Sequence, residues 1–431
     1  MAKDTADKAP VLLDVDGTLL RTDLLWEAIW AGLGSAPLAT IAALFKNIGN
    51  IAALKAEIAA IVTLRYDLMP VREEVLQLAL DAEADGRAVG LASASEKRWV
   101  EGIAEASGLS GPIHASEGGT NLKGPAKARA LEAAYGKGGY IYAGDAPADR
   151  PVWESAQAAI VVGNRPAARK LEAQGTPVIE IAGSWAWGDL FRALRPHQWV
   201  KNILLLLPLI AAHDFALASF GLVALGIVAF SAAASAIYIV NDLLDLEADR
   251  LHATKRHRPF ASGAVPITVG MGASAGLIVL ALALAMLLSP WFLGAVVLYM
   301  ALSLAYSLRL KRMRWVDIVT LASLYTLRVV AGAAATQVEA SAMMLIFIFP
   351  VFLSLGCVKR LTELTLATSD APLPGRGYGR ADRGDLLNVA SIGVVGALLV
   401  FFLYSLSDQA AALYPTRWIL WLALIPIGIW L

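Results

Sequence analysis

Hydrophobic and polar positions follow different patterns in the two parts of the chain. Up to residue 182, short apolar runs alternate with segments of helical periodicity, which is typical of an α/β fold. From residue 196 onward, long apolar runs follow one another, most of them near the ~20 residues that an α-helix needs to cross a bilayer. The pattern therefore predicts an α/β domain at 1–182, a linker at 183–195 and an all-α bundle of membrane helices at 196–431.

The short apolar runs of the first part predict the strands of a parallel, Rossmann-like sheet. Residues 24–80 are rich in Ala and Leu and separate the first run from the second, so they predict a small helical cap. The expected strands are Val11–Val15, Ala88–Ala92, Gly139–Ala143, Ala159–Val162 and Pro177–Ile181.

Eight apolar runs of the second part predict membrane spans, at 200–213, 216–240, 268–288, 291–307, 316–335, 341–358, 386–407 and 416–431. Lys and Arg gather in every second loop, at 241–267, 308–315 and 359–385. The N-terminus is polar and does not resemble a signal peptide. The positive-inside rule therefore predicts a multi-pass protein of the inner (plasma) membrane, with the first domain and the charged loops on the cytoplasmic side.

Composition narrows the class of protein. The chain is 57% hydrophobic, with a mean hydropathy of +0.60, which is too apolar for a single water-soluble domain. The formal net charge is zero, so no nucleic-acid partner is expected. The one cysteine, Cys357, excludes an internal disulfide and a cysteine-rich zinc site. A homo-oligomer is compatible with the sequence.

Two acidic side chains close the first predicted strand. Asp14 and Asp16 precede a Gly17-Thr18 turn, at the strand end where parallel α/β proteins bind ligands. Further motifs follow in order along the chain, and together the pattern over residues 11–182 resembles the haloacid dehalogenase (HAD) superfamily. These motifs contain Ser93, Lys123, and the pair Asp145 and Asp149.

The HAD resemblance implies a Mg²⁺-dependent phosphatase. Asp14 would attack phosphorus, while Asp16 would protonate the leaving oxygen and then activate water. Ser93 and Lys123 would bind the phosphate. Mg²⁺ would be held by Asp14, Asp16, Asp145 and Asp149.

A second acidic cluster follows the apolar run 216–240. Asn241, Asp245 and Asp249 are four residues apart and would share one face of a continuous helix, with Asp242 beside them. Oxygen ligands at the end of a membrane helix suit Mg²⁺ carrying a pyrophosphate, although a solvated helix end is the simpler interpretation. Cations follow at once and would bind phosphate oxygens: Lys255, Arg256 and Arg258.

This second pattern resembles the UbiA superfamily of intramembrane prenyltransferases, and residues 192–431 resemble its decaprenyl-phosphate phosphoribosyltransferase branch. That branch usually has nine spans, and a ninth is absent from these 431 residues. Arg328 lies inside a predicted span and needs a partner, for which Asp317 is the candidate. By the resemblance, the substrate-binding residues also include Lys201, Tyr306, Lys311, Asp317, Arg328, Lys359 and Arg360.

One departure from the broader superfamily favours this branch. A second Asp-x-x-x-Asp motif would hold the other side of a prenyl diphosphate, but here Asp317 is followed four residues later by Leu321. A single acidic cluster suits one metal-bound pyrophosphate, as in phosphoribosyl pyrophosphate (PRPP).

The two resemblances together imply a bifunctional membrane enzyme. The membrane domain would transfer 5-phosphoribose from PRPP to polyprenyl phosphate, and the HAD domain would remove the 5-phosphate to give polyprenyl-phosphoryl ribose for cell-envelope glycans. Two alternatives stay open. One is a UbiA-type prenyltransferase that uses a prenyl diphosphate and carries a regulatory HAD domain. The other is a transporter or scaffold with a regulatory soluble domain.

Overall fold

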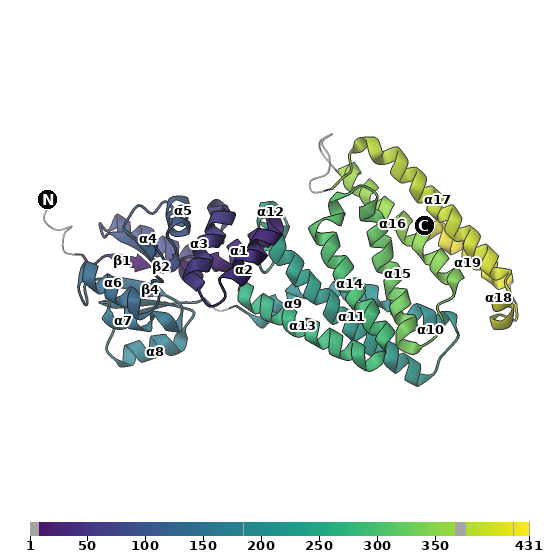
Figure 1. Cartoon of the computed structure of the whole chain (residues 1–431), viewed down its shortest axis with the longest axis horizontal. Helices are drawn as coiled ribbons and strands as arrows, with labels where there is room; N and C mark the ends of the chain where they lie inside the picture. The colour runs from purple at the N-terminus through teal and green to yellow at the C-terminus, as the bar shows by residue number, and fades with distance from the viewer. Residues whose placement is uncertain (1–7, 184, 367–375, 417, 431) are drawn as a thin grey trace. The chain divides into compact units, whose positions relative to one another are not determined.

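The computed structural model describes residues 8–183, 185–366, 376–416 and 418–430. The chain forms two compact units (Figure 1). The first contains Met1–Ala193 and Asp242–Gly272, and the second contains Leu194–Asn241 and Ala273–Leu431. The segment Asp242–Gly272, which carries most of the second acidic cluster, therefore packs with the α/β part of the chain.

The first unit is built on a six-stranded sheet in which all paired strands are parallel and the order is β3-β2-β1-β4-β5-β6. Strand β1 lies between β2 and β4, so the order reverses beside it, where open α/β sheets bind ligands. The strands are β1 Val11–Leu13, β2 Val89–Glu96, β3 Ile113–Ser116, β4 Ile141–Gly144, β5 Ala158–Val162 and β6 Val178–Ile181.

Helices cover both faces of this sheet (Figure 1). On one face the core closes around Trp99 of α5, and on the other around Trp153 of α7. The predicted parallel sheet with helices is therefore confirmed. The crossover helices are α4 Glu73–Ala84, α5 Lys97–Ser107, α6 Pro125–Tyr135, α7 Arg150–Ser155 and α8 Arg165–Ala173.

A helical insertion follows β1, as the composition of residues 24–80 predicts. It consists of α1 Leu24–Ser35, α2 Pro37–Lys46 and α3 Ile51–Ile61. An antiparallel bridge between Leu20 and Val71 joins its two ends, so α4 is the crossover to β2 rather than part of the cap. The segment expected as a linker contains a short helix, α9 Trp187–Ala193, and its Ser184 lies outside the described residues.

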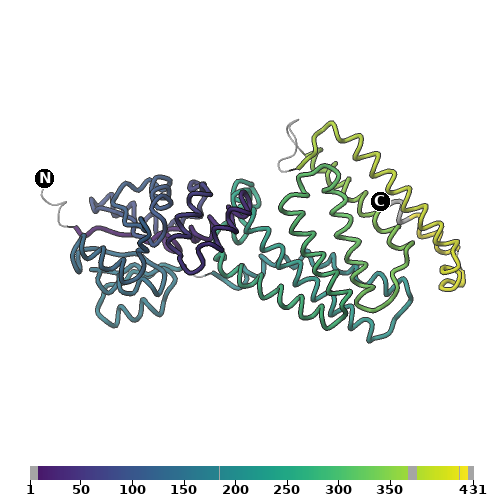
Figure 2. Tube along the Cα trace, in the orientation of Figure 1, coloured from purple at the N-terminus to yellow at the C-terminus, as the bar shows by residue number. Residues whose placement is uncertain are grey.

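Six helices of the described residues are long and apolar enough to cross a membrane. They match the predicted spans from 216–240 to 386–407, and Figure 2 follows their path. These helices are α11 Leu217–Leu244, α13 Ile267–Leu288, α14 Pro290–Leu308, α15 Val316–Thr336, α16 Ala342–Leu366 and α17 Arg383–Ser405.

The first predicted span, 200–213, is not one α-helix. It is a 3₁₀ helix, η4 Pro196–Leu206, followed by the short α10 Leu207–Ala211. Pro208 lies in the first turn of α10, where the backbone N–H that proline lacks would have no partner within the helix. Gly332 of α15 packs on this segment so closely that a Cβ would lie 2.1 Å from the carbonyl oxygen of Leu205. In the last predicted span, 416–431, the structure contains α19 Trp418–Trp430, and residues 417 and 431 lie outside the described residues. The short α18 Asp408–Leu413 precedes this span.

Candidate active sites

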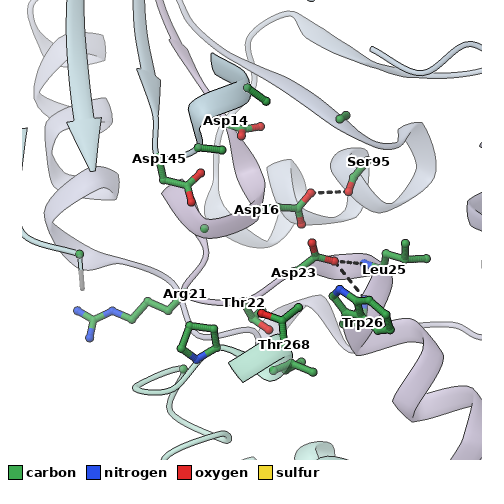
Figure 3. Close-up of a pocket in the computed structure, with 18 of the residues that line it drawn as sticks. Asp14, Asp16, Arg21, Thr22, Asp23, Leu25, Trp26, Ser95, Asp145 and Thr268 are labelled. Carbon is green, nitrogen blue, oxygen red and sulfur yellow. Dashed lines mark hydrogen bonds between the residues drawn. The ribbon is translucent and has the colours of Figure 1, made fainter. Parts of the chain in front are cut away.

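Three carboxylates meet at the carboxyl ends of β1 and β4. Asp14 follows β1, and Asp145 and Asp149 follow β4; because the two strands are parallel neighbours, their ends share one edge of the sheet. One oxygen of each carboxylate lies within 4.8 Å of the others. Figure 3 shows the side chains of Asp14 and Asp145 close to each other. Three convergent carboxylate oxygens are a donor set that fits Mg²⁺.

A buried lysine neutralises part of this cluster. Lys127 of α6 places its Nζ 3.1 Å from Asp14 Oδ1 and 3.2 Å from Asp149 Oδ1. The Tyr142 hydroxyl donates to the same Asp149 oxygen over 2.8 Å. Sequence reasoning missed Lys127, which lies four residues beyond the expected Lys123, on α6, and is buried. Only the three-dimensional contact distinguishes the two lysines.

Burial favours the protonated forms of Asp14 and Asp145. It raises the pKa of Asp14 well above the usual range, against the pull of Lys127, and Asp149 and Asp145 raise it further. Burial, with a smaller contribution from Asp149, raises the pKa of Asp145 to about 7. A bound cation would therefore favour the ionised form of Asp14 that nucleophilic attack requires.

Asp16 points away from the three-carboxylate cluster. Its Oδ1 accepts from the Leu24 backbone amide over 2.8 Å, and its Oδ2 accepts from Ser95 Oγ over 2.5 Å (Figure 3). The structure thus brings Asp14, Asp145 and Asp149 together and holds Asp16 toward the first turn of α1. Ser93 is fully buried beneath Asp16, inside a strand that continues to Glu96, whereas Ser95 lines the pocket.

The turn that carries Asp16 depends on Gly17 and is stabilised by hydrogen bonds from Arg72. Gly17 has φ +77°, and a Cβ there would lie 2.3 Å from Asp145 Oδ2. The buried Arg72 donates to the carbonyl oxygens of Gly17 and Thr18, over 3.2 and 3.1 Å. These contacts fix the chain between Asp14 and the insertion.

A pocket of about 760 Å³ opens over these acids. The insertion supplies Trp26 and Lys55 to its wall, and the ammonium of Lys55 donates to the carbonyl of Ala94. Burial lowers the pKa of Lys55, while Asp16 and Asp23 oppose that change. The exposed Lys123 also lines the pocket, so it can reach a bound phosphate without contacting Asp14.

Replacing Lys127 should test which lysine stabilises the site. Lys127→Met leaves Asp14 and Asp149 buried without their cation, so we expect the first unit to lose about 3–5 kcal/mol of stability. Mg²⁺ should restore part of that loss, because it binds only the folded cluster. Hydrogen exchange of β1 and β4 in the full chain, with and without Mg²⁺, measures both effects.

Lys123→Met is the matched control. Because Lys123 is exposed, we expect a change within about 0.5 kcal/mol. Equal protection of β1 in the two variants would contradict the role assigned to Lys127.

The second acidic cluster is not on one continuous helix, so that expectation is wrong. Helix α11 ends at Leu244, Asp245 has φ −104° and ψ 16°, and α12 begins at Leu246. Within the first unit, Asp242 and Asp249 are both buried and converge on Arg258, whose Nη1 lies 3.2 and 2.6 Å from them. Burial raises the pKa of Asp249, against the pull of Arg258.

The segment with this acidic cluster is anchored on the insertion of the α/β part. Arg250, the residue after Asp249, forms an ion pair of 2.5 Å with Glu27 of α1, and both side chains are almost fully buried. The Thr22 hydroxyl donates to the same Glu27 oxygen over 2.7 Å. Because a buried charge without its partner is costly, this ion pair ties the segment to α1.

The remaining residues of the acidic segment have different surroundings. The buried amide oxygen of Asn241 has no hydrogen-bond partner among the described residues, which makes it available to a ligand. Lys255 and Arg256 are exposed on the 3₁₀ turn Lys255–His257.

Arg328 of α15 is buried in the second unit, but Asp317 is not its partner. Its Nε donates to Asn202 Oδ1 over 3.0 Å, and its Nη2 donates to the Tyr299 hydroxyl over 3.3 Å. The rings of Tyr299 and Tyr325 lie 5.0 and 5.3 Å from its guanidinium carbon, and Lys201 lies 5.9 Å from the Tyr325 ring. Aromatic rings and an amide therefore stabilise this cation.

Asp317 is instead the centre of a separate buried cluster. Arg360 of α16 contacts both of its oxygens, at 2.5 and 3.0 Å, and Arg376 lies 3.3 Å away. The Tyr306 hydroxyl also donates to Asp317, over 2.8 Å. Asp317 is therefore paired with two arginines. Of the other predicted substrate-binding residues, Lys359 is exposed and Lys311 is half-buried.

Part of the chain matches a known protein family. Residues 203–364 match the UbiA prenyltransferase family. The chain is 34% identical to the uncharacterized protein y4nM of Sinorhizobium fredii, over 98% of this chain and 83% of that protein. Residues 203–364 therefore form a UbiA-type domain, in a multi-span chain that also carries an α/β domain.

The chain has two further similarities to known proteins. The chain is 40% identical to decaprenyl-phosphate phosphoribosyltransferase of Mycobacterium tuberculosis, over 41% of this chain and 60% of that enzyme's length. Among solved structures, a UbiA homologue from Archaeoglobus fulgidus, bound to DMAPP and Mg²⁺, superposes with a TM-score of 0.46 at 15% identity. That match covers 56% of this chain and 86% of the other.

Proposed function

We propose that the membrane part transfers 5-phosphoribose from PRPP to a polyprenyl phosphate. A phosphate oxygen of the lipid attacks C1 of the ribose, the bond from C1 to the pyrophosphate oxygen breaks, and pyrophosphate leaves. Asn241, Asp245 and Asp249 would hold the Mg²⁺ that neutralises this leaving group. The exposed Lys255 and Arg256 would bind phosphate oxygens.

The missing second acid beside Asp317 is the observation that carries this proposal. A pair of acids at this position would be needed to hold the second side of a prenyl diphosphate. Here Leu321 stands in place of the second acid of the motif, and Asp317 itself is paired with Arg360 and Arg376. Together with the similarity to an enzyme named for phosphoribosyl transfer, this favours PRPP over a prenyl diphosphate as the donor.

For the α/β domain we propose a HAD-type phosphatase. Asp14 Oδ attacks the phosphorus of the 5-phosphate, the bond to the ribose oxygen breaks, and Asp16 protonates that oxygen. Asp16 then removes a proton from the water that hydrolyses the aspartyl-phosphate. Asp14, Asp145 and Asp149 would hold Mg²⁺, which supplies charge neutralisation for an anionic nucleophile meeting an anionic substrate.

One feature of the pocket supports the lipid product as the phosphatase substrate. Ile267 and Thr268, which begin α13, line the same pocket as Asp14 and Asp16. Because α13 is long enough to cross a membrane, a phosphate attached to a membrane lipid could enter there. The product would be polyprenyl-phosphoryl ribose, a pentose donor for cell-envelope glycans, made on the cytoplasmic side of the inner membrane.

Donor choice tests the membrane activity. Purified full-length protein should transfer label from PRPP to polyprenyl phosphate in the presence of Mg²⁺. It should not prenylate a hydroxybenzoate from a prenyl diphosphate, because Asp317 without a second acid at position 321 cannot form a second metal site. Thin-layer chromatography of the extracted lipid measures both reactions. Efficient prenylation would reverse the assignment, and no transfer from either donor would favour a transport or scaffold role.

A further inference from the structure

Helix α2 of the insertion has its apolar side chains on the outside. Leu38, Ile41 and Phe45 recur at helical spacing and are 84%, 41% and 71% exposed; Ile48 follows in the turn at 76%. The small residues Thr40 and Ala43 face inward instead. These four large side chains form what we call the α2 apolar face. Large exposed apolar patches mark interaction sites.

The polar groups near this face are paired with one another. Glu57 is the only acid between residues 28 and 66. It accepts from Lys46 Nζ over 3.1 Å and from Asn47 Nδ2 over 2.6 Å, which ties the end of α2 to α3. The hairpin therefore holds its apolar residues in fixed positions and carries no unpaired acid that would oppose burial in lipid.

Within the first unit, the insertion approaches the end of one candidate membrane helix and shares a pocket with the start of another. A Cβ on Gly34 of α1 would lie 3.5 Å from the carbonyl oxygen of Leu244, the last residue of α11, and α2 begins three residues after Gly34. Ile51 of α3 lines the same pocket as Ile267, the first residue of α13. Both α11 and α13 are long and apolar enough to cross a membrane.

From this continuity we propose that the α2 apolar face lies in the membrane surface, at the boundary between lipid headgroups and acyl chains. A helix end that leaves a bilayer brings the neighbouring chain to headgroup depth, and an apolar helix face next to it is buried by inserting there. The α2 apolar face would thereby hold the phosphatase pocket against the lipid. This location rests on the insertion and the spans alone, and does not depend on the proposed reactions.

Label depth in a bilayer tests the proposal. Cys357 is the only cysteine, so Cys357→Ala gives a cysteine-free chain. Ala42→Cys places a thiol on the exposed side of α2, and a fluorophore attached there reports its surroundings. In proteoliposomes containing lipids with nitroxide near the headgroup, we expect this label to be quenched several-fold more strongly than a control label and to be shielded from aqueous iodide.

The matched control is Ala106→Cys on α5, an exposed alanine next to the exposed Glu105. Equal quenching of the two labels by the nitroxide lipid would overturn the proposal. Shielding of the Ala42 label from iodide without quenching by the lipid would also overturn it, because a second copy or another protein would then cover the face. The measurement needs no substrate, so it holds even if neither proposed activity is found.

Discussion

Asp14→Asn should abolish dephosphorylation while leaving lipid phosphoribosylation intact. The substitution keeps the shape of the side chain but removes the charge and nucleophilicity of its oxygen, and loss of a nucleophile costs roughly 10⁴-fold or more in turnover. The domain should stay folded, because Lys127 keeps Asp149 as a partner. Mass spectrometry of the extracted lipid should find the 5-phosphorylated product in the variant and the dephosphorylated product in the wild type.

Asp85→Asn provides the control, since Asp85 is an exposed acid of the same domain and lies at the end of α4. It should give the wild-type lipid. If the wild type and Asp14→Asn accumulate the same phosphorylated lipid, the α/β domain acts on another substrate or regulates the membrane part.

Asp249→Asn should lower the rate of phosphoribosyl transfer by about 100-fold or more. Asp249 is buried beside Asp242, and an amide cannot supply the negative charge that a metal-bound pyrophosphate requires. The amide oxygen can still accept from Arg258, so the segment should keep its fold. Transfer of labelled ribose from PRPP to lipid at saturating Mg²⁺ measures the effect.

Glu247→Gln is the matched control, because Glu247 is an exposed acid on the same short helix α12. We expect wild-type transfer from it. Wild-type turnover in Asp249→Asn would remove the acidic segment from the reaction, whereas equal losses in both variants would point to the fold of α12 rather than to the charge of Asp249.

The sequence predicted those features that depend on local pattern. Alternating short apolar runs and helical segments predicted a parallel sheet with helices. Of the eight predicted spans, six match helices of the described residues that are long and apolar enough to cross a membrane. The HAD resemblance also implied that Asp14, Asp145 and Asp149 share one site, and the structure brings these three acids together. Strand β3 was missed because Ile113–Ser116 is too short to show a period.

Within the candidate sites, the sequence does not settle the contacts that depend on how far a side chain reaches. Lys123 and Lys127 are equally plausible in the sequence, and only packing places Lys127 between Asp14 and Asp149. The regular spacing of Asn241, Asp245 and Asp249 suggested one helix face, but the helix breaks at Asp245. A residue pattern cannot report such a break when no Pro or Gly marks it.

The sequence by itself determined the parallel sheet of the first part and the UbiA-type character of residues 203–364, because hydrophobic periodicity and local motifs depend on neighbouring residues. The tertiary structure alone decided which partners the buried charged side chains have. Arg328 contacts Asn202 and aromatic rings, and Asp317 pairs with Arg360. Arg250 pairs with Glu27, 223 positions earlier in the chain. A buried charge must find a counter-charge or a hydrogen-bond partner wherever the fold provides one, and the partner's distance along the chain does not enter that free energy.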